Sequence, residues 1–252
     1  NPCDLKPLRL TCDEHGIMLL EDNCESLGAS VGGRQCGAWG DIGTHSFFFS
    51  HQLATAEGGM LVTNDCLLAD LARCLRAHGW ARDLPADSIL HDRSEDEFAE
   101  AYRFLMPGYN VRPTEIAAAV GLVQLGKLDA ALEQRRRNAA EFKRLFHDDD
   151  RFLTQTELPG AQSSWFGFTI IPTKAPRSQF LEPMRRAEIE FRQITGGNFL
   201  QHPAAAHYDH EAFGYGCPTA QYAHDQGFFV GNHPIDLAPQ LTRLREVLEE
   251  AA

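Results

Sequence analysis

The spacing of apolar and polar residues in the first third of the chain predicts alternating strands and helices. The expected elements are a helix over 5–14, strands over 17–22, 44–49 and 59–63, and a helix over 65–78. The run at 17–22 is apolar until it ends in acids, which is typical of a parallel strand buried on both faces. Asn64 or Asp65 can cap the second helix. The alternation predicts an α/β layer.

The pattern changes in the second half of the chain. Residues 81–108 are polar and irregular, and a long helical stretch then runs from Pro113 to about His147. The remaining expected elements are a strand over 163–172, a helix over 178–187, a strand over 190–192 and a helix over 238–251. Together they predict a small α+β domain attached through the long helix.

Composition and charge exclude several classes of function. The 252 residues are 43% hydrophobic and carry a formal net charge of −12, which disfavours nucleic-acid binding because phosphate contacts need clustered cations. No apolar run approaches the ~20 residues that span a bilayer, so no membrane association is expected. The seven cysteines form no CxxC pair, which favours free thiols in a reducing cytoplasm and disfavours a metal site. The GxGxxG and P-loop motifs are absent.

Candidate catalytic groups follow two of the expected strands. Asp22 stands where open α/β sheets bind ligands, and a buried carboxylate there would keep a pyridine nitrogen protonated. The alternative is that Asp22 caps the next turn. Ser46 can donate to a phosphate and His51 can act as a general base, although a histidine in an apolar segment is commonly a packed core or loop residue.

Two further segments combine cations with turns. Residues 76–82 place His78 and Arg82 around an aromatic, which suits a diphosphate or sugar hydroxyls and equally suits the capped end of a helix. Asn110 and Arg112 precede the long helix, where backbone donors can hold a phosphate or simply form a capping turn. The residues alone leave both interpretations open.

Several segments occur in an order and spacing that resemble one enzyme family over essentially the whole chain. They are residues 20–26, 46–53 with 57–59, 76–80, 107–113, 163–168, 197–200 and 229–233. They are similar to the DegT/DnrJ/EryC1/StrS family of pyridoxal-phosphate (PLP) sugar enzymes. The resemblance implies an α/β fold of type I, like aspartate aminotransferase. It implies that 1–125 form the C-terminal part of the large cofactor-binding domain, 126–150 a connecting helix and 151–252 a small α+β domain.

A histidine stands where the aminotransferases of this family carry the lysine that attaches the cofactor. The resemblance places that lysine five residues after Ser46, which is the position of His51. An amine can bind an aldehyde cofactor covalently, whereas an imidazole cannot hold such a bond but can move protons. The exchange therefore indicates proton-transfer chemistry on a loosely held cofactor.

The resemblance implies a role for each candidate residue. Asp22 would pair with the pyridine nitrogen, and Glu25 would lie against the ring hydroxyl. Ser46 would bind the phosphate, and His51 would be the acid/base. Asn110 would reach the cofactor phosphate of the neighbouring subunit, since active sites in this family form across a homodimer. The candidates for substrate contacts are His78, Arg82 and Arg112.

The implied activity is a 3-dehydration. Within the family the likeness is to enzymes that use pyridoxamine 5′-phosphate (PMP) to remove the 3-hydroxyl of a nucleotide-linked 4-keto-6-deoxy sugar, here GDP-4-keto-6-deoxymannose. Such enzymes act on routes to colitose-type 3,6-dideoxy sugars and O-antigen. Glutamate would be the amino donor that restores PMP, in a cytoplasmic homodimer.

Three alternatives stay open. An iron–sulfur 3-dehydratase of CDP-4-keto-6-deoxyglucose also has histidine for lysine, but it needs a cysteine cluster and residues 79–109 contain no cysteine. A sugar aminotransferase is opposed by the missing lysine. The third alternative is a non-catalytic, truncated homologue, since a phosphate turn and a ring-stacking aromatic are expected upstream of Asn1 and the chain is expected to be a fragment. Gln52 and Gln193 depart from the family pattern of His and Pro.

Overall fold

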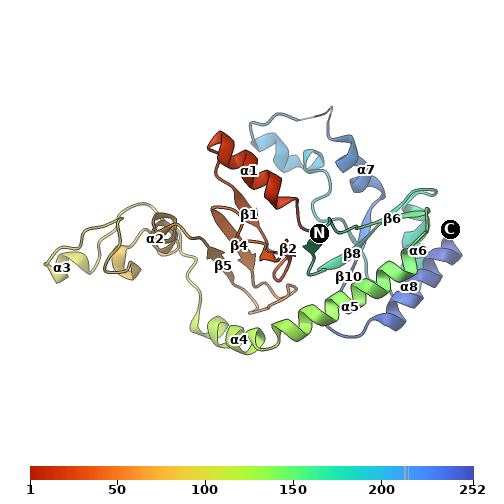
Figure 1. Ribbon diagram of the computed structural model, residues 1–252, viewed down its shortest axis with the longest axis horizontal. Coiled ribbons are helices and arrows are strands. Elements are labelled where there is room, and N and C mark those ends of the chain that lie inside the picture. The colour runs from red at the N-terminus through yellow and green to blue at the C-terminus, as the bar shows by residue number, and fades with distance from the viewer. Residues whose placement is uncertain (213, 215) are drawn as a thin grey trace. The chain divides into compact units, whose positions relative to one another are not determined.

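The structure, a computed structural model, describes residues 1–212, 214 and 216–252. By its internal contacts the chain divides into two compact units (Figure 1). The first unit comprises Pro2–Asp129 with Leu158–Ser163, and the second comprises Asn1, Ala130–Glu157 and Ser164–Ala252. The functional division at 125 and 150 stays a prediction.

A three-stranded mixed sheet organises the first unit. Its strands are β1 (Leu20–Asp22), β4 (Ile42–Ser46) and β5 (Gly59–Val62), in the order β1-β4-β5. β1 runs parallel to β4, and β4 pairs antiparallel with β5. Helix α1 (Leu5–His15) precedes the sheet and α2 (Cys66–Leu75) follows it, so the alternation of helices and strands is confirmed.

The expectation that residues 17–22 are buried on both faces is wrong. Ile17, Met18 and Leu20 are 55%, 61% and 57% exposed. β1 is an edge strand, and β4 is its only strand partner in the described part of the chain. An apolar strand is buried on two faces only if other elements pack against both. The described residues cover one face of β1 alone.

Strand alternation separates two sets of polar residues on this sheet. Successive side chains of a strand point to opposite faces, and directly paired residues such as Asp22 and Thr44 share a face. Glu21 and His45 are 6% and 8% exposed on the buried face. Asp22 is exposed, and Thr44 and Ser46 are half-buried. We call the side with Asp22, Thr44 and Ser46 the open face.

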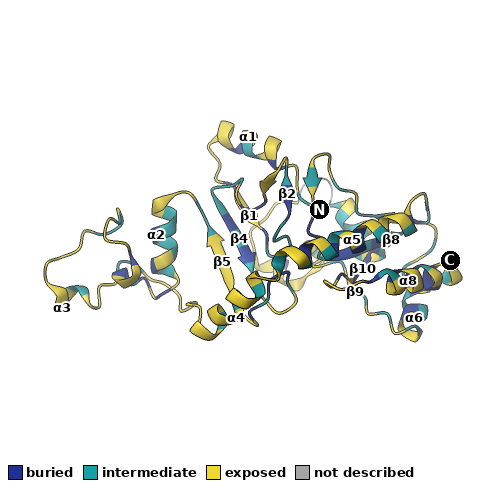
Figure 2. Cartoon of the chain, turned by 60° about the horizontal axis from the view of Figure 1, so that its bottom comes forward, coloured by how far each residue is buried: buried dark blue, intermediate teal, exposed yellow. Residues whose placement is uncertain are grey.

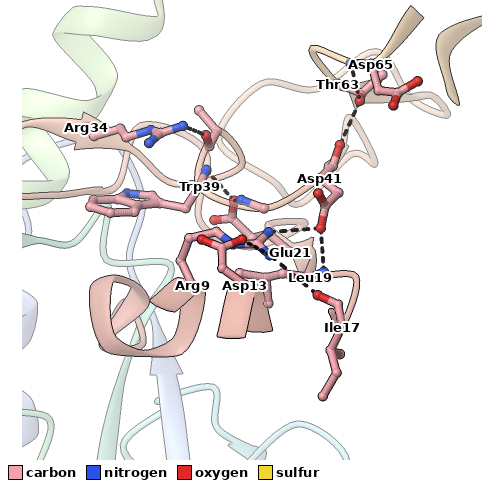
Figure 3. A network of polar contacts seen from close by, with 12 residues as sticks. Arg9, Asp13, Ile17, Leu19, Glu21, Arg34, Trp39, Asp41, Thr63 and Asp65 are labelled. Carbon is pink, nitrogen blue, oxygen red and sulfur yellow. Dashed lines mark hydrogen bonds and ion pairs between the residues drawn. The ribbon is translucent and has the colours of Figure 1, made fainter. Parts of the chain in front are cut away.

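The Glu21 carboxylate holds the loop before β4 against β1. Its oxygens accept hydrogen bonds from the backbone N–H groups of Gly37 at 2.7 Å, Trp39 at 2.6 Å and Gly40 at 2.6 Å. Figure 3 shows Glu21 with Trp39. A buried carboxylate is costly unless donors surround it, and charge-assisted hydrogen bonds are among the strongest available. These three bonds therefore fix the path of the chain from residue 37 to residue 40.

A second carboxylate joins α1 to the sheet. Asp41 accepts hydrogen bonds from the Arg9 guanidinium at 2.9 Å and from the Leu19 backbone N–H at 2.7 Å (Figure 3). The bond from Arg9, together with that amide, holds the pKa of Asp41 below its usual value. The Thr63 hydroxyl donates to the Asp41 carbonyl at 2.7 Å. One polar network thus links α1, the start of β1, the start of β4 and the end of β5.

Short elements complete the first unit. A second, antiparallel sheet has the order β3 (Arg34–Gln35), β2 (Ser30–Val31), β7 (Ala161–Gln162). Residues 81–108, expected to be irregular, contain the 3₁₀ turn η1 (Ala81–Asp83) and the four-residue helix α3 (Glu97–Glu100). Asp65 caps α2 by accepting a hydrogen bond from the Leu68 N–H at 3.0 Å, which confirms one of the two predicted caps.

The expected single helix over 113–147 is wrong, because the stretch forms two helices. α4 spans Glu115–Leu125 and α5 spans Leu128–Phe146. Between them the Lys127 N–H bonds to the Gln124 carbonyl three residues back, at 2.9 Å, which is the spacing of a tighter turn. Gly126 occupies this turn, and glycine has a low helix propensity. No residue of α4 is buried, as its colouring in Figure 2 shows.

The second unit contains a four-stranded antiparallel sheet. Its order is β6 (Phe152–Thr154), β8 (Gly167–Pro172), β10 (Phe228–Gly231), β9 (Arg192–Gln193). Its other elements are α5, α6 (Ser178–Arg186), the turns η2 (Phe199–Gln201) and η3 (Pro203–His207), α7 (Pro218–Gln226) and α8 (Ala238–Ala251). A fully buried core stabilises it, with Phe142, Phe168, Phe180, Phe228 and Leu248 all at 0% or 1% exposure.

The sequence pattern predicts this unit in outline. The helices expected at 178–187 and 238–251 are confirmed as α6 and α8. The strand expected at 163–172 is shorter, since β8 begins at Gly167. The strand expected at 190–192 lies at β9, and α7 and β10 were not expected.

Replacing Glu21 with alanine is expected to lower the free energy of unfolding by about 3 kcal/mol. The three backbone N–H groups that it binds would lose their acceptor, and hydrogen bonds to a charged group contribute about 1.5–3 kcal/mol each without full additivity. Urea unfolding of the full-length protein, followed by circular dichroism, measures the change. Glu14→Ala, at an exposed position of α1, is the matched control and should stay within about 0.5 kcal/mol. Equal stability of the two variants would contradict this role of Glu21.

Candidate active site

The open face brings several of the candidate residues together. Thr44 lies beside Asp22 in the register of β1 and β4, and Ser46 follows two residues later on the same face. The β5 residue opposite Ser46 is Gly59, which adds no side chain to the face. The open face is therefore a short row of a carboxylate and two hydroxyls at the carboxyl ends of two parallel strands, where α/β sheets bind ligands.

Asp22 caps the turn that follows β1. Its carboxylate accepts a hydrogen bond from the Cys24 backbone N–H at 3.1 Å. Hydrogen bonding from Cys24 is the main cause that lowers the pKa of Asp22, and the nearby His51 lowers it further. The side chain is exposed, so the expectation of a buried carboxylate is wrong, since β1 is an edge strand. Because its pKa lies below the usual value, Asp22 stays ionised at neutral pH.

Burial excludes a reactive thiol next to Asp22. Burial, together with the hydrogen bond to Asp22, raises the pKa of the Cys24 thiol to about 11. The thiolate is the nucleophilic form of cysteine, and its population at neutral pH is small at such a pKa. The Cys24 thiol is therefore almost fully protonated at neutral pH.

A hydrogen-bonded loop positions His51. The Thr55 N–H donates to the Phe47 carbonyl at 2.8 Å, and the Thr55 hydroxyl donates to the Glu57 carbonyl at 2.9 Å. Within this loop the His51 N–H donates to the Phe48 carbonyl at 3.0 Å, and the two rings meet edge to face with centroids 6.1 Å apart. The imidazole is half-buried, and its loop leaves directly from the strand that carries Ser46.

Gln52 ties the His51 loop to the turn after β1. Its side-chain Nε2 donates to the Glu25 carbonyl at 2.6 Å, and Gln52 is 9% exposed. The departure from the family pattern at Gln52 thus does not leave the turn loose. The Ser46 hydroxyl accepts a hydrogen bond from the Phe48 N–H at 3.2 Å, so it too belongs to the start of this loop. The Glu25 side chain is exposed.

The other candidate residues form a second group on the segment after α2. The His78 N–H donates to the Tyr109 carbonyl at 2.7 Å, and the Val111 N–H donates to the Arg76 carbonyl at 2.9 Å. Asn110 pairs with Ala77 in an isolated bridge. In Figure 1 this segment extends from the sheet beyond β5. Residues 76–81 thus pair with 103–111, and this pairing brings together the segments that carry His78, Arg82, Asn110 and Arg112. These four residues form a group separate from the open face.

Two glycines allow this pairing. A Cβ on Gly79 would lie 1.6 Å from the Met106 carbonyl oxygen, and a Cβ on Gly108 would lie 2.2 Å from the Gly79 nitrogen. The backbones therefore approach too closely for any side chain at either position. Gly79 is not the cap of a helix that reaches His78, since α2 ends at Leu75.

The expected helix N-terminus after Arg112 lies further along the chain. Thr114 is the N-cap of α4, with its hydroxyl accepting from the Ala117 N–H at 3.1 Å, so Pro113 precedes the helix. The Arg112 guanidinium donates instead to the Asn110 side-chain oxygen at 3.4 Å. The backbone donors of a helix N-terminus therefore do not lie within 108–113, and a phosphate site there stays a prediction.

Two negative observations limit the chemistry of the described residues. Among residues 1–212, 214 and 216–252, no three His, Cys, Asp or Glu side chains are grouped to hold a metal ion. In the same part of the chain, no helix is long and apolar enough to cross a membrane.

Comparison with known proteins identifies the family. A sequence model of the DegT/DnrJ/EryC1/StrS aminotransferase family matches residues 1–237, and the chain belongs to this family. The expected fold of the PLP-dependent transferases is thereby confirmed. The chain is 41% identical to the GDP-4-keto-6-deoxy-D-mannose 3-dehydratase of Yersinia pseudotuberculosis, over 99% of this chain and 64% of that protein.

Two solved structures of GDP-4-keto-6-deoxymannose-3-dehydratase show the same architecture. Each is 40% identical to this chain, covers 98% of it and has a TM-score of 0.94. One is a mutant with bound GDP-perosamine, and the other holds a trapped PLP-glutamate geminal diamine. This chain spans 65% of the length of each, and thus somewhat less than two thirds of its relatives.

Gly108→Ala is expected to loosen the segment that carries His78 and Asn110. The added methyl group would overlap the Gly79 nitrogen, and overpacking of this kind costs about 1–3 kcal/mol. Hydrogen exchange measured by mass spectrometry should become faster in peptides that cover 75–81 and 104–111.

Gly126→Ala is the matched control for this experiment. A Cβ at Gly126 has an ordinary contact of 3.6 Å with the Val123 carbonyl oxygen, so no change in those peptides is expected. Unchanged exchange in Gly108→Ala would show that the close approach does not hold the two strands together.

Proposed function

We propose that this chain forms the catalytic part of a PLP/PMP-dependent 3-dehydratase acting on a nucleotide-linked 4-keto-6-deoxy sugar, GDP-4-keto-6-deoxymannose. The observation that carries the proposal is His51, which lies beside the ionised Asp22 on the loop that follows the open face. The 41% identity to a 3-dehydratase supports the reaction, and GDP-perosamine in a solved relative supports the nucleotide. The pathway would be the formation of 3,6-dideoxy sugars of the colitose type for O-antigen.

The side chains of the open face fit a pyridoxal-type cofactor. Asp22 is a carboxylate whose pKa lies below its usual value, so it can accept a hydrogen bond from a protonated pyridine nitrogen. Ser46 offers a hydroxyl for the phosphate, and Glu25, exposed in the turn after β1, would offer a carboxylate for the ring hydroxyl. When bound, PMP supplies an amine for the sugar ketone and a ring that accepts electrons. These residues would hold such a cofactor without a covalent bond.

His51 would move the proton that the reaction needs. In our proposal its imidazole takes a proton from the C4′ carbon of the cofactor and helps to protonate the leaving 3-hydroxyl. The loop contacts of Thr55 and Gln52 would keep the ring in place. A lysine at this position would instead bond to the cofactor.

The second group of residues would serve substrate and partner. His78, Arg82 and Arg112 would contact the nucleotide sugar, since cationic donors suit a diphosphate. Asn110 would reach the cofactor phosphate of a second subunit in a homodimer. Glutamate would return the cofactor to PMP, which the PLP-glutamate adduct in a solved relative supports. The proposed location is the cytoplasm.

Two other reactions are less well supported. A sugar aminotransferase would need a lysine where His51 stands. An iron–sulfur dehydratase would need a cysteine cluster, and residues 79–109 contain no cysteine. A non-catalytic role is disfavoured by the ionised carboxylate, the hydroxyl and the imidazole of Asp22, Ser46 and His51.

His51→Asn is expected to slow the removal of the 3-hydroxyl by about 10²–10⁴-fold, because a positioned general base contributes about that much. Asparagine keeps a hydrogen bond but cannot carry the proton. Retention of PMP should be nearly unchanged, since Asp22 and Ser46 would provide the binding. The measurement is single-turnover deoxygenation by PMP-loaded full-length protein.

His15→Asn, on the exposed last turn of α1, is the matched control and should turn over like the wild type. If the His51→Asn protein also turns over at the wild-type rate, another group moves the proton. If the His51→Asn protein instead loses PMP, His51 serves to bind the cofactor.

A further inference from the structure

The turn at residues 196–198 in the second unit is held by two histidines. The side-chain Nε2 of His202 donates to the Gly196 carbonyl at 2.6 Å, and the Asn198 backbone N–H donates to the Nδ1 atom of His224 at 3.2 Å. The two imidazole rings lie edge to face, with centroids 6.4 Å apart. One ring therefore supplies a donor to the turn, and the other ring supplies an acceptor.

The backbone of this turn lies directly against the His224 ring. A Cβ on Gly197 would be 2.3 Å from the Nδ1 atom of His224, and Gly197 has a φ of +52°. Only glycine allows this approach. The Asn198 side chain, which is 3% exposed, adds a contact with α7 by donating to the Gln221 side-chain oxygen at 2.9 Å. The turn is thus fixed to α7 through both a ring and an amide.

Gln193 brings a second donor to the same atom of His224. Its side-chain Nε2 lies 3.1 Å from Nδ1 and 3.3 Å from the ring Nε2. An amide nitrogen carries hydrogens and accepts none, so Gln193 donates to the ring. The family pattern has proline here, which offers no such donor. The departure at Gln193 thus adds a contact between β9 and α7.

Two donors at Nδ1 require a neutral His224. A neutral imidazole has one nitrogen that accepts, whereas both nitrogens of an imidazolium donate. Protonation would therefore set a ring N–H against the N–H groups of Asn198 and Gln193. The bond from His202 would survive, because a protonated imidazole still donates to a carbonyl. Two protonated rings at this distance would also repel each other.

The other charged groups around His224 are already engaged. Besides His202, the charged side chains that contact His224 or flank its partners are those of Arg177, Glu190, Arg192 and Asp225. Arg177 donates to the His224 carbonyl at 2.9 Å. Arg192 pairs with Glu190 at 2.8 Å, and Asp225 accepts from the Gln221 side chain at 2.9 Å. Both carboxylates thus have partners and offer a protonated His224 little compensation.

We propose that His224 is a pH-sensitive latch on the turn at 196–198. Imidazole is the side chain that changes its charge between about pH 5 and 8. Above this range the neutral ring holds the turn between β9 and α7. As the pH falls through it, Nδ1 ceases to accept and the turn is released, whereas the buried core of the second unit contains no titratable group and stays folded.

Hydrogen exchange of the full-length protein, corrected for the intrinsic rate at each pH, tests the latch. On going from about pH 7.5 to about pH 5.5, peptides that cover 194–200 should lose about 2- to 10-fold in protection, which corresponds to one hydrogen bond. Peptides from the buried part of α5 should not change.

Two variants assign the response to His224. In His224→Asn the side-chain oxygen can take the place of Nδ1 as an acceptor and does not titrate, so the turn should stay protected at both pH values. In His224→Leu no acceptor remains, so the turn should exchange rapidly at both. His207→Asn, at an exposed position of η3, is the matched control and should respond like the wild type.

Equal protection of the 194–200 peptides at the two pH values in the wild type would overturn the proposal. A full pH response in His224→Asn would also overturn it, since the response would then come from another group. Hydrogen exchange needs no turnover, so either result is independent of the proposed 3-dehydration.

Discussion

The three hydrogen bonds that the Glu21 carboxylate accepts decide which side of the main sheet can meet a ligand. They hold residues 37–40 against one side of β1, so that side is filled by the chain itself. Because side chains alternate along a strand, the next residue must point the other way. Asp22 is therefore presented on the open face with Thr44 and Ser46. The two adjacent acids thus lie on opposite sides of the strand, Glu21 against the chain and Asp22 on the open face.

The loop after β4 carries the remaining part of the site. Its backbone is closed by Thr55, and its tip is joined to the turn after β1 by Gln52. Both contacts return the chain toward Asp22, which explains why His51 acts on the pKa of that carboxylate. These neighbouring polar contacts consequently set the position of the loop that carries His51.

The sequence could predict those parts of the site that are formed by residues close to one another along the chain. A strand ending in acids, the segment that carries His51 and the Asp65 cap were all visible in the pattern. The exposure of Asp22 and the break at Gly126 could not be predicted in the same way. The first depends on which strands pair with β1, and the second on the balance of a helix around one glycine.

Nonlocal contacts account for what the sequence did not predict. The role of Glu21 depends on amides 16 to 19 residues away, although its place next to Asp22 in a strand could have indicated an inward side chain. The stack of Trp80 with Tyr102 and Phe104 depends on the pairing of two irregular segments, which Gly79 and Gly108 permit. No periodic pattern marks such pairing.

The central claim is that a cofactor is held here without a covalent bond, which leaves His51 to move a proton. The most direct measurement treats the full-length protein with PLP and sodium borohydride and then determines its intact mass after denaturation. Borohydride makes a bond between PLP and a lysine permanent. The account predicts an unchanged protein mass, with PLP released on denaturation. A stoichiometric increase by one reduced cofactor, located on a lysine, would contradict it.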